Sequence, residues 1–286
     1  MDPAFLLIQV LNGVQYGLLL FLIASGLTLI FGIMGVINLA HGALYMVGAY
    51  LAFWFTSRTG SFWLAILLAL PLTVLLGLVI ERWFMRALYK RNHLDQVLLT
   101  FGLILVLNEC QSILFGNDVH GVPVPAPFSG SIPLTDVLSY PVYRLFVSFV
   151  CALIAVGMYF LIQHTRLGMV IRGGASNREM MAGMGINVHT VFGLVFAAGT
   201  ALAAFAGMIS APLSSVYPGI GDSVLIISFV VVVIGGIGSI KGAFLGALMV
   251  GLTATFGTVF LPELSGAVVY ALMAAVLLWR PRGLFA

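Results

Sequence analysis

The most restrictive feature of this sequence is a series of long apolar runs without a charged residue, such as 145–162. A helix needs about twenty residues to cross the roughly 30 Å hydrocarbon core of a bilayer. A membrane β-barrel would instead show alternating segments of about ten residues. Because lipid offers no hydrogen bonds, spanning segments must be helices or barrel strands. The unbroken runs therefore predict an all-α, polytopic membrane protein.

The composition excludes a water-soluble globule and gives no sign of a nucleic-acid partner. Hydrophobic residues make up 62% of the chain and charged residues 7%, whereas soluble domains carry about a quarter charged residues. The net charge is +3, but the basic residues are spread out and form no dense stripe. The partner that the composition predicts is the lipid bilayer.

Polar residues divide the chain into eight or nine membrane-embedded segments, which we expect to form a single transmembrane domain over residues 1–286. The segments are predicted near 5–31, 36–56, 62–81, 95–115, 142–163, 189–211, 223–237, 241–259 and 264–279. The stretch 235–242 is rich in glycine and polar residues, so we expect a broken or re-entrant helix there.

The basic residues predict the orientation, because Lys and Arg accumulate on the cytoplasmic side. Ten of them follow segments that would end on the same side: Arg82, Arg86, Lys90, Arg91, Arg166, Arg172, Arg178, Lys241, Arg280 and Arg282. Only Arg58 and Arg144 fall on the other side. This distribution predicts an external N-terminus and a cytoplasmic C-terminus, with the proline-rich loop 116–141 outside.

Two groups of polar residues inside predicted segments are candidates for a substrate pathway, since polar side chains are costly against lipid. Asn38 and His41 would lie one helical turn apart on one face; they either line the path or fix the packing of helices. Asn108 and Glu109 lie near the outer end of the fourth segment and either serve transport or reach water by snorkelling. Asn12 and Gln15 of the first segment would join them in an external vestibule.

A series of glycines carries two further interpretations. Gly235, Gly236 and Gly238 belong to a set of small residues that permits close approach of helices. A broken helix at this point would also aim its N-terminal dipole at an anionic group such as a substrate carboxylate.

The stretch 165–187 is expected to be a cytoplasmic segment containing a short amphipathic helix. The helix would start at Ser176 and Asn177, carry Met180, Met181 and Met184, and end at Gly185. Flexible methionine side chains suit insertion into the groove of a partner protein. The alternative is a helix that lies on the lipid surface.

The sequence contains none of the motifs that would make the chain an enzyme. It has no GxxxxGK[ST] phosphate loop, HExxH, GxSxG or CxxC motif. Neither a catalytic residue nor a metal site is predicted, and any ATP-driven mechanism must use ATPase subunits outside this chain.

Four stretches resemble the LivH-type permeases of branched-chain amino acid ABC importers, and together they extend over most of the chain. They are LNGVQYGLLLFLIASGLTLIFGIMGVINLAHGALYMVG at 11–48, RLGMVIRGGASNREMMAGMGINV at 166–188, SAPLSSVYPGIGDSVLIISFVVVVIGGIGSIKGAFLGA at 210–247 and RPRGLF at 280–285. The resemblance implies a multi-pass protein of the bacterial inner membrane that moves branched-chain amino acids or related small polar solutes.

The resemblance also implies the partners. These would be a LivM-like second permease or a second copy of this chain, two cytoplasmic ATP-binding subunits and a periplasmic solute-binding protein. No cofactor is expected on this chain, and ATP and Mg would be bound by the partner subunits. The residues implied in docking on an ATPase are Gly168, Arg172, Ala175, Asn177, Met180, Met181, Gly185 and Ile186.

Other functions remain open from the sequence. Permeases of this superfamily also carry urea, amides or aromatic acids, and a sugar is a further alternative. An ion-coupled secondary transporter is the rival from another class; such proteins place pairable ionisable groups near the bilayer midplane.

Overall fold

The structure is a bundle of long helices, analysed from a computed structural model that describes residues 3–89, 91–134 and 138–285. Nine long helices occur in the described ranges: α1 (Pro3–Met34), α2 (His41–Thr59), α3 (Phe62–Trp83), α4 (His93–Phe115), α5 (Val142–His164), α8 (Val188–Ser210), α9 (Ile220–Gly235), α10 (Ile240–Phe260) and α11 (Ser265–Trp279). Two short helices, α6 (Arg166–Ser176) and α7 (Arg178–Gly183), lie between α5 and α8. The remaining elements are three 3₁₀ turns, at Met85–Leu88, Ala126–Phe128 and Pro262–Leu264, and two short strands, β1 (Ser131–Pro133) and β2 (Ser139–Pro141).

Length and composition let seven of the described helical stretches cross a membrane, which confirms the predicted polytopic all-α class. They contain α1, α3, α4, α5, α8, α10 and α11. The helix α9 is apolar but shorter. Helix starts follow local sequence, because polar side chains cap the free N–H groups of the first turn. The capping residues are Ser61, Thr165, Asn177, Asn187 and Ser239.

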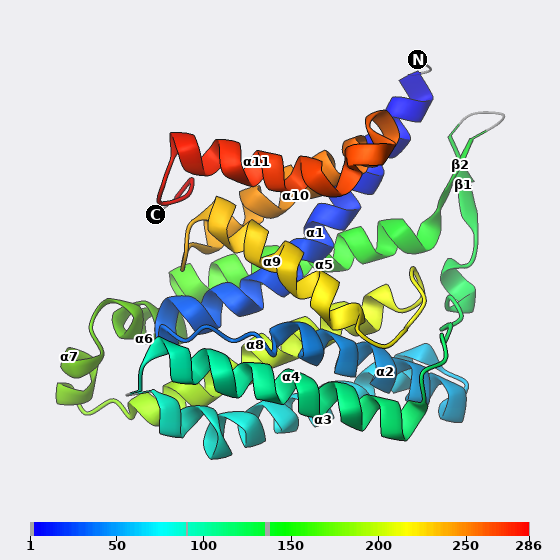
Figure 1. The fold of residues 1–286 in the computed structure, drawn as a ribbon. Helices are drawn as coiled ribbons and strands as arrows, with labels where there is room; N and C mark the ends of the chain where they lie inside the picture. The colour runs from blue at the N-terminus through cyan, green and yellow to red at the C-terminus, as the bar shows by residue number, and fades with distance from the viewer. Residues whose placement is uncertain (1–2, 90, 135–137, 286) are drawn as a thin grey trace.

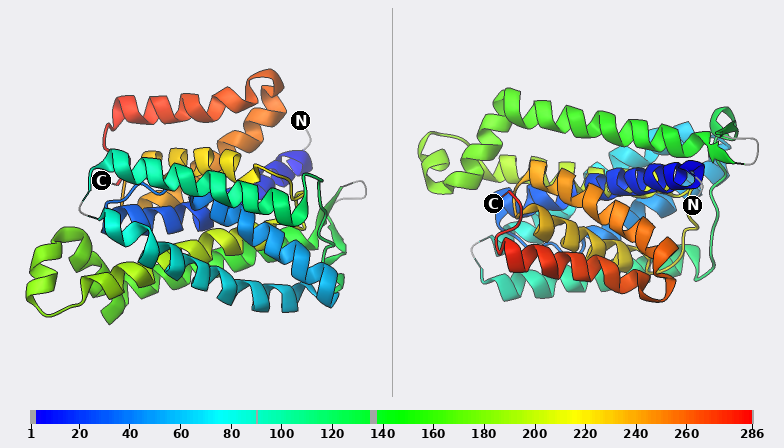
Figure 2. Two further views of the ribbon diagram at one scale, coloured as in Figure 1. Left: turned by 60° about the horizontal axis from the view of Figure 1, so that its bottom comes forward. Right: turned by 90° about the horizontal axis from the view of Figure 1, so that it is seen from above.

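Apart from the starts of α2 and α9, the helix ends gather at two opposite ends of the bundle (Figures 1 and 2). The α3–α4 and α9–α10 connections, the helices α6 and α7, and the C-terminus share one end. The N-terminus, the α2–α3 connection and the β1–β2 hairpin lie at the other. The described segments that carry nine of the ten basic residues assigned to one side are thus at one end of the bundle. Which side of the membrane this end faces stays a prediction. Lys90, one of those ten, lies outside the described residues.

The second helix begins at His41, so the expectation of a helix from residue 36 is wrong. Gly35 has a left-handed backbone (φ 60°) and ends α1 by donating to Phe31 O at 2.9 Å. The chain then runs without helical structure into the bundle, where α2 starts (Figure 1). A second non-helical segment, 211–219, leads into the bundle in the same way and precedes α9.

The first turns of α2 and α9 meet inside the bundle. A Cβ added to Gly42 would overlap the carbonyl oxygen of Gly221, and one added to Gly221 would overlap that of Gly42. Glycine is required at both positions because no side chain fits between the two backbones. The interior interruptions of the helical bundle are therefore at 35–40 and 211–219.

The glycine-rich stretch 235–242 forms a turn at one end of the bundle rather than a break within it. The helix α9 ends at Gly235 and α10 starts at Ile240. Gly236 (φ 99°) and Gly238 (φ 83°) make the turn. Ile237 and Gly238 are exposed there. The helix is therefore interrupted where the sequence predicted it, but the interruption is a surface turn rather than a re-entrant segment.

The loop 116–141 is tied down by backbone hydrogen bonds. His120 and Val216 exchange two of them, each 2.8 Å long, which joins this loop to the α8–α9 connection. The strands β1 and β2 pair antiparallel farther along the loop. The sequence shows this loop to be rich in proline, and the hairpin adds order that prolines alone do not specify.

Candidate functional site

A cavity of about 250 Å³ lies between α1, α2, α8, α9 and the α8–α9 connection. Most of its polar groups are hydroxyls, so we call it the hydroxyl-lined cavity. Its polar lining consists of Gln15, Tyr16, Tyr45, Ser210, Ser214, Tyr217 and Ser223. Leu19, Leu20 and Ile23 of α1 contribute apolar surface.

Gln15 is the predicted pathway residue that this cavity contains. Its side chain is only 6% exposed and borders the cavity. Asn12, one turn earlier on α1, behaves differently, because its Oδ1 accepts a 2.7 Å hydrogen bond from Arg144 Nη1 of α5. A buried amide is costly unless it is hydrogen-bonded, so Gln15 is suited to bond a solute in the cavity.

Tyr45 and Ser210 form a hydrogen bond across the cavity wall, with their oxygens 2.5 Å apart. Ser210 Oγ also lies 3.0 Å from the carbonyl oxygen of Gly207, to which it donates. A serine hydroxyl has a single hydrogen, so Tyr45 is the donor in the Tyr45–Ser210 pair. This bond holds α2 against α8 and leaves lone pairs of both oxygens available as acceptors.

The cavity carries no formal charge in its described lining. None of the lining residues is Asp, Glu, Lys or Arg. A solute with a net charge would lose its hydration here without meeting an opposite charge, which is costly. Hydroxyl and amide groups around an apolar wall fit a small solute without net charge, including a zwitterion whose charges bond to several of these groups.

Asn38 and His41 do not line the hydroxyl-lined cavity. His41 is fully buried at the start of α2, and its Nε2 donates to Ile23 O at 2.9 Å. Asn38 Oδ1 accepts from Ala40 N at 3.1 Å. The expectation that both residues share a helical face is wrong, since Asn38 precedes α2. His41 Nδ1 and Asn38 Nδ2 have no partner among the described residues.

Asn108 and Glu109 line a different hollow, of about 710 Å³, on α4. Glu109 is exposed. Pro218 and Gly219 border this hollow, whereas their neighbours Tyr217 and Ile220 border the hydroxyl-lined cavity. The predicted single vestibule is therefore two separate spaces with the segment 217–220 contributing to both.

Gly235, Gly236 and Gly238 lie at the other end of α9 from the hydroxyl-lined cavity. Gly235 is packed against Gly242 of α10 so closely that a Cβ on either would overlap the other's backbone. Gly238 approaches Gly32 of α1, with a Cβ built on it 3.3 Å from Gly32 Cα. These contacts are those of the packing interpretation, and contact with a substrate remains a prediction.

The segment 165–187 contains two helices where the sequence predicted one. Residues 166–176 form α6, which packs Gly168 against the carbonyl groups at the end of α5. The second helix, α7, is capped by Asn177, whose Oδ1 accepts from Met180 N at 2.9 Å. Gly185 then has a left-handed backbone (φ 80°), as expected of a residue just past a helix.

The two methionines of α7 and Met184, which follows it, do not share one face. Met180 and Met184 are exposed by 67% and 71%, whereas Met181 is 4% exposed. A Cβ added to Gly174 of α6 would lie 3.2 Å from the Met181 methyl carbon, so Met181 fastens α7 to α6. The expectation that all three methionines form an exposed surface is therefore wrong for Met181. Ile186 is half-buried, and the Ala175 side chain lies outside the described residues.

The sequence did not reveal two hydrogen bonds between polar side chains inside the bundle. The hydroxyls of Tyr45 and Ser210 were not singled out, because such residues are ordinary in membrane helices and come together only in three dimensions. Glu81 is only 5% exposed, and its Oε1 accepts a 2.5 Å hydrogen bond from the Tyr89 hydroxyl.

Comparisons with known proteins agree on one family. The family described as "Branched-chain amino acid transport system / permease component" matches residues 9–277. The high-affinity branched-chain amino acid transport system permease protein BraD of Pseudomonas aeruginosa is 33% identical, over 96% of this chain and 94% of BraD. The corresponding permease protein LivH of Escherichia coli K12 is 31% identical, with the same coverage of each chain. No solved structure gives a significant match.

Proposed function

Because this chain belongs to the family of permease components of branched-chain amino acid transport systems, we propose that it is the membrane-spanning permease subunit of an ATP-driven importer for amino acids. The observation that carries this proposal is the family match over residues 9–277, which includes most or all of each of the nine long helices in the described chain. The chain is a multi-pass membrane protein, and we place it in the bacterial inner membrane.

The division of labour follows from what the sequence lacks. Since no phosphate-loop motif is present, ATP and Mg are bound by two cytoplasmic ATP-binding subunits, and this chain is not an enzyme. A periplasmic solute-binding protein delivers the solute, and a LivM-like permease or a second copy of this chain completes the membrane part. Residues 1–286 form one transmembrane domain. The segment 165–187 of this domain couples it to an ATP-binding subunit.

The solute that we propose is a branched-chain amino acid, in keeping with the names of the relatives. The hydroxyl-lined cavity supports this choice by its chemistry. Its apolar wall from α1 suits an aliphatic side chain, and Gln15 with the hydroxyls of Tyr45 and Ser210 offers donors and acceptors to an uncharged or zwitterionic solute. Urea, amides, aromatic acids and sugars are the alternative solutes for an ATP-driven permease.

The test of the cavity is uptake of labelled leucine into cells that produce the complete importer with variants of this chain. Gln15→Leu keeps the side-chain size and removes the amide, so uptake at low leucine should fall by about tenfold, the worth of one or two hydrogen bonds. The matched control is Thr28→Val on the same helix. Thr28 is buried, its hydroxyl has no partner among the described residues, and it does not line the cavity.

Two further results decide the interpretation. Unlabelled isoleucine and valine should compete with leucine, and urea should not. If Gln15→Leu and Thr28→Val complexes, present in equal amounts in the membrane, import leucine equally well, the cavity is not on the solute path. If urea or an amide competes and isoleucine does not, the proposed solute class is wrong.

A further inference from the structure

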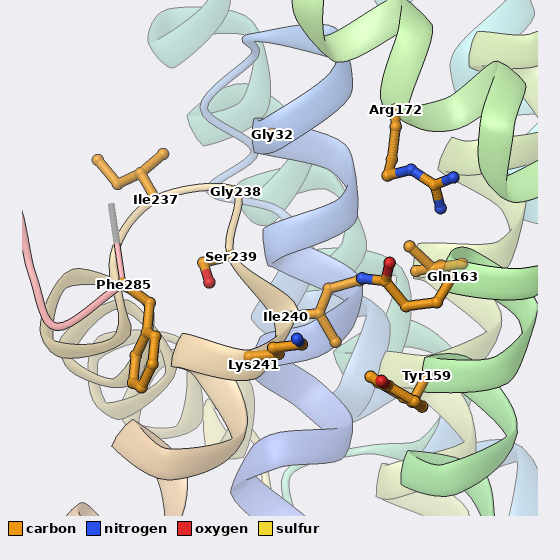
Figure 3. A pocket seen from close by; sticks show the side chains of 11 residues that line it. Gly32, Tyr159, Gln163, Arg172, Ile237, Gly238, Ser239, Ile240, Lys241 and Phe285 are labelled. Carbon is orange, nitrogen blue, oxygen red and sulfur yellow. The ribbon is translucent and has the colours of Figure 1, made fainter.

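Two further cavities lie away from the hydroxyl-lined cavity, at the end of the bundle where the basic residues gather. The first has a volume of about 510 Å³ and lies where α1, α5, α6 and the α9–α10 turn meet (Figure 3). Its polar side chains are Tyr159 and Gln163 of α5, Arg172 of α6, and Ser239 and Lys241 beside the start of α10. We call it the basic pocket.

The basic pocket has two positive charges and no negative one in its described lining. Arg172 enters from α6, and Lys241 from the first turn of α10 (Figure 3). Lys241 Nζ lies 5.6 Å from the centre of the Tyr159 ring, which positions the cation over the ring face. Two cations from different helices that face one pocket without a carboxylate create a site for an anion.

The backbone adds to this positive potential. Ser239 caps α10 by accepting from Gly242 N at 3.1 Å. The N–H groups of Ile240 and Lys241, the first two of the helix, have no acceptor among the described backbone groups. A helix N-terminus carries a partial positive charge and free N–H donors, which favour phosphate groups. Arg172, Lys241 and the start of α10 therefore act in the same direction.

An apolar cavity of about 420 Å³ adjoins the basic pocket, and the two share Tyr159, Ile240, Lys241 and Phe285. From these shared residues it continues between α5 and α10, where Ala155 and Val156 face Phe244 and Leu245. Val156 and Leu245 are exposed by 53% and 42%, so the cavity opens on the surface that lipid would contact. We call it the apolar groove.

The geometry points to a binding site for one anionic phospholipid. Its phosphate would bind Arg172, Lys241 and the N-terminus of α10 in the basic pocket, and an acyl chain would occupy the apolar groove between α5 and α10. A soluble phosphate would occupy only the basic pocket. A protein helix in the apolar groove would not require the two cations at the end of that groove. Basic pockets between membrane helices on the cytoplasmic side are suited to anionic lipid headgroups.

The site has a structural consequence for the chain's own elements. A lipid held by Arg172 and Lys241 would join α6, which precedes α7, to the start of α10. Lipid occupancy would thus stabilise the position of α6 relative to the helix bundle. This inference does not depend on which solute the permease carries.

The test is titration of the delipidated full-length chain with phosphatidylglycerol or phosphatidylcholine, followed by mass spectrometry of the intact complexes. The first phosphatidylglycerol should bind more tightly than the first phosphatidylcholine. The double variant Arg172→Gln/Lys241→Gln should weaken phosphatidylglycerol binding by on the order of 20-fold, the effect of two charges near a membrane surface. Binding of phosphatidylcholine should change little, which also shows that the variant is folded.

The matched control is Arg91→Gln/Arg282→Gln, which removes two exposed charges from the same end of the bundle but outside the pocket. It should keep the phosphatidylglycerol preference of the wild type. Equal losses in the two double variants would show diffuse attraction and overturn the site, as would a wild type without preference.

A third variant separates a lipid from a free anion. Val156→Trp fills the apolar groove from its exposed side and should weaken phosphatidylglycerol binding while Arg172 and Lys241 are intact. If excess inorganic phosphate displaces the lipid and Val156→Trp has no effect on lipid binding, the pocket takes a soluble anion and the lipid proposal is wrong.

Discussion

Several glycines mark points where helix backbones touch in this bundle. A Cβ added to Gly48 of α2 would overlap the backbone of Ala204 in α8, and one added to Gly207 of α8 would overlap the carbonyl of Tyr45. Close approach through small residues is a main source of helix association in membranes, where lipid is as apolar as the side chains. The Tyr45–Ser210 hydrogen bond depends on the same α2–α8 contact.

Gly48→Ala should therefore destabilise the protein. The added methyl group has no room, and overpacking of this kind costs about 1–3 kcal/mol. Gly157→Ala in α5 is the matched control, because a Cβ there meets nothing within 4 Å and alanine is the better helix former. The measurement is the thermal unfolding midpoint in detergent, which should fall for Gly48→Ala alone. A shared decrease, or none, would contradict the packing interpretation.

The sequence predicted individual residues where a physical cost was visible in it. An amide such as Gln15 is conspicuous in an apolar run because burial penalises it, and the structure places it in a cavity. Tyr45 and Ser210 carry no such signal, and 165 positions separate them in the chain. Their hydrogen bond follows from tertiary packing, which hydropathy does not encode. Asn38 was placed on a helix because the left-handed turn at Gly35 cannot be recognised from the apolar pattern alone.

At the scale of elements, hydropathy predicted the long helices well because lipid imposes their length. The predicted segments 62–81 and 142–163 correspond to α3 and α5 within two residues at each end. The helix α6 was missed, since three glycines and two arginines in 166–176 weaken any helical pattern. The β1–β2 hairpin was missed for a related reason: its strands have only three residues each and contain prolines.

The helix α7 is the element with which we expect an ATP-binding subunit to make contact. Met180→Glu should lower leucine-stimulated ATP hydrolysis by the complete complex at least several-fold, because a charge replaces an exposed apolar side chain that we propose docks on the ATP-binding subunit. Met181 is unsuitable for this test, since it is buried against α6. The measurement is ATPase activity of purified complexes in the presence of the loaded binding protein.

Thr190→Glu provides the control for Met180→Glu. Thr190 is exposed in the first turn of α8, where a negative charge suits the helix dipole. This variant should keep normal ATPase stimulation. Normal assembly and stimulation in the Met180→Glu complex would remove α7 from the coupling interface.

The whole molecule is organised around two helices. In its most apolar stretch α1 is 89% buried and α8 72% buried, whereas the values for α4, α5 and the stretch containing α11 are 22%, 17% and 11%. The outer helices therefore present apolar faces that lipid or a second permease must cover. A chain of this shape supplies a hydrophobic framework with a small polar interior, and its sequence contains no phosphate-loop motif.

The alternating states of such a permease require an external source of free energy. A conformational equilibrium shifts only when something binds its two states with different affinity. In our account the ATP-binding subunits provide this difference. In an ion-coupled secondary transporter, bound ions would provide it, and this chain would concentrate its solute without partners.

The most direct measurement is leucine accumulation in proteoliposomes that contain this chain, with and without its partner subunits. The account predicts accumulation against a gradient only when the second permease, the ATP-binding subunits, the binding protein and ATP are all present. Proteoliposomes with this chain alone should show neither ATP hydrolysis nor uptake driven by a proton or sodium gradient. Uphill transport by the isolated chain would contradict the account.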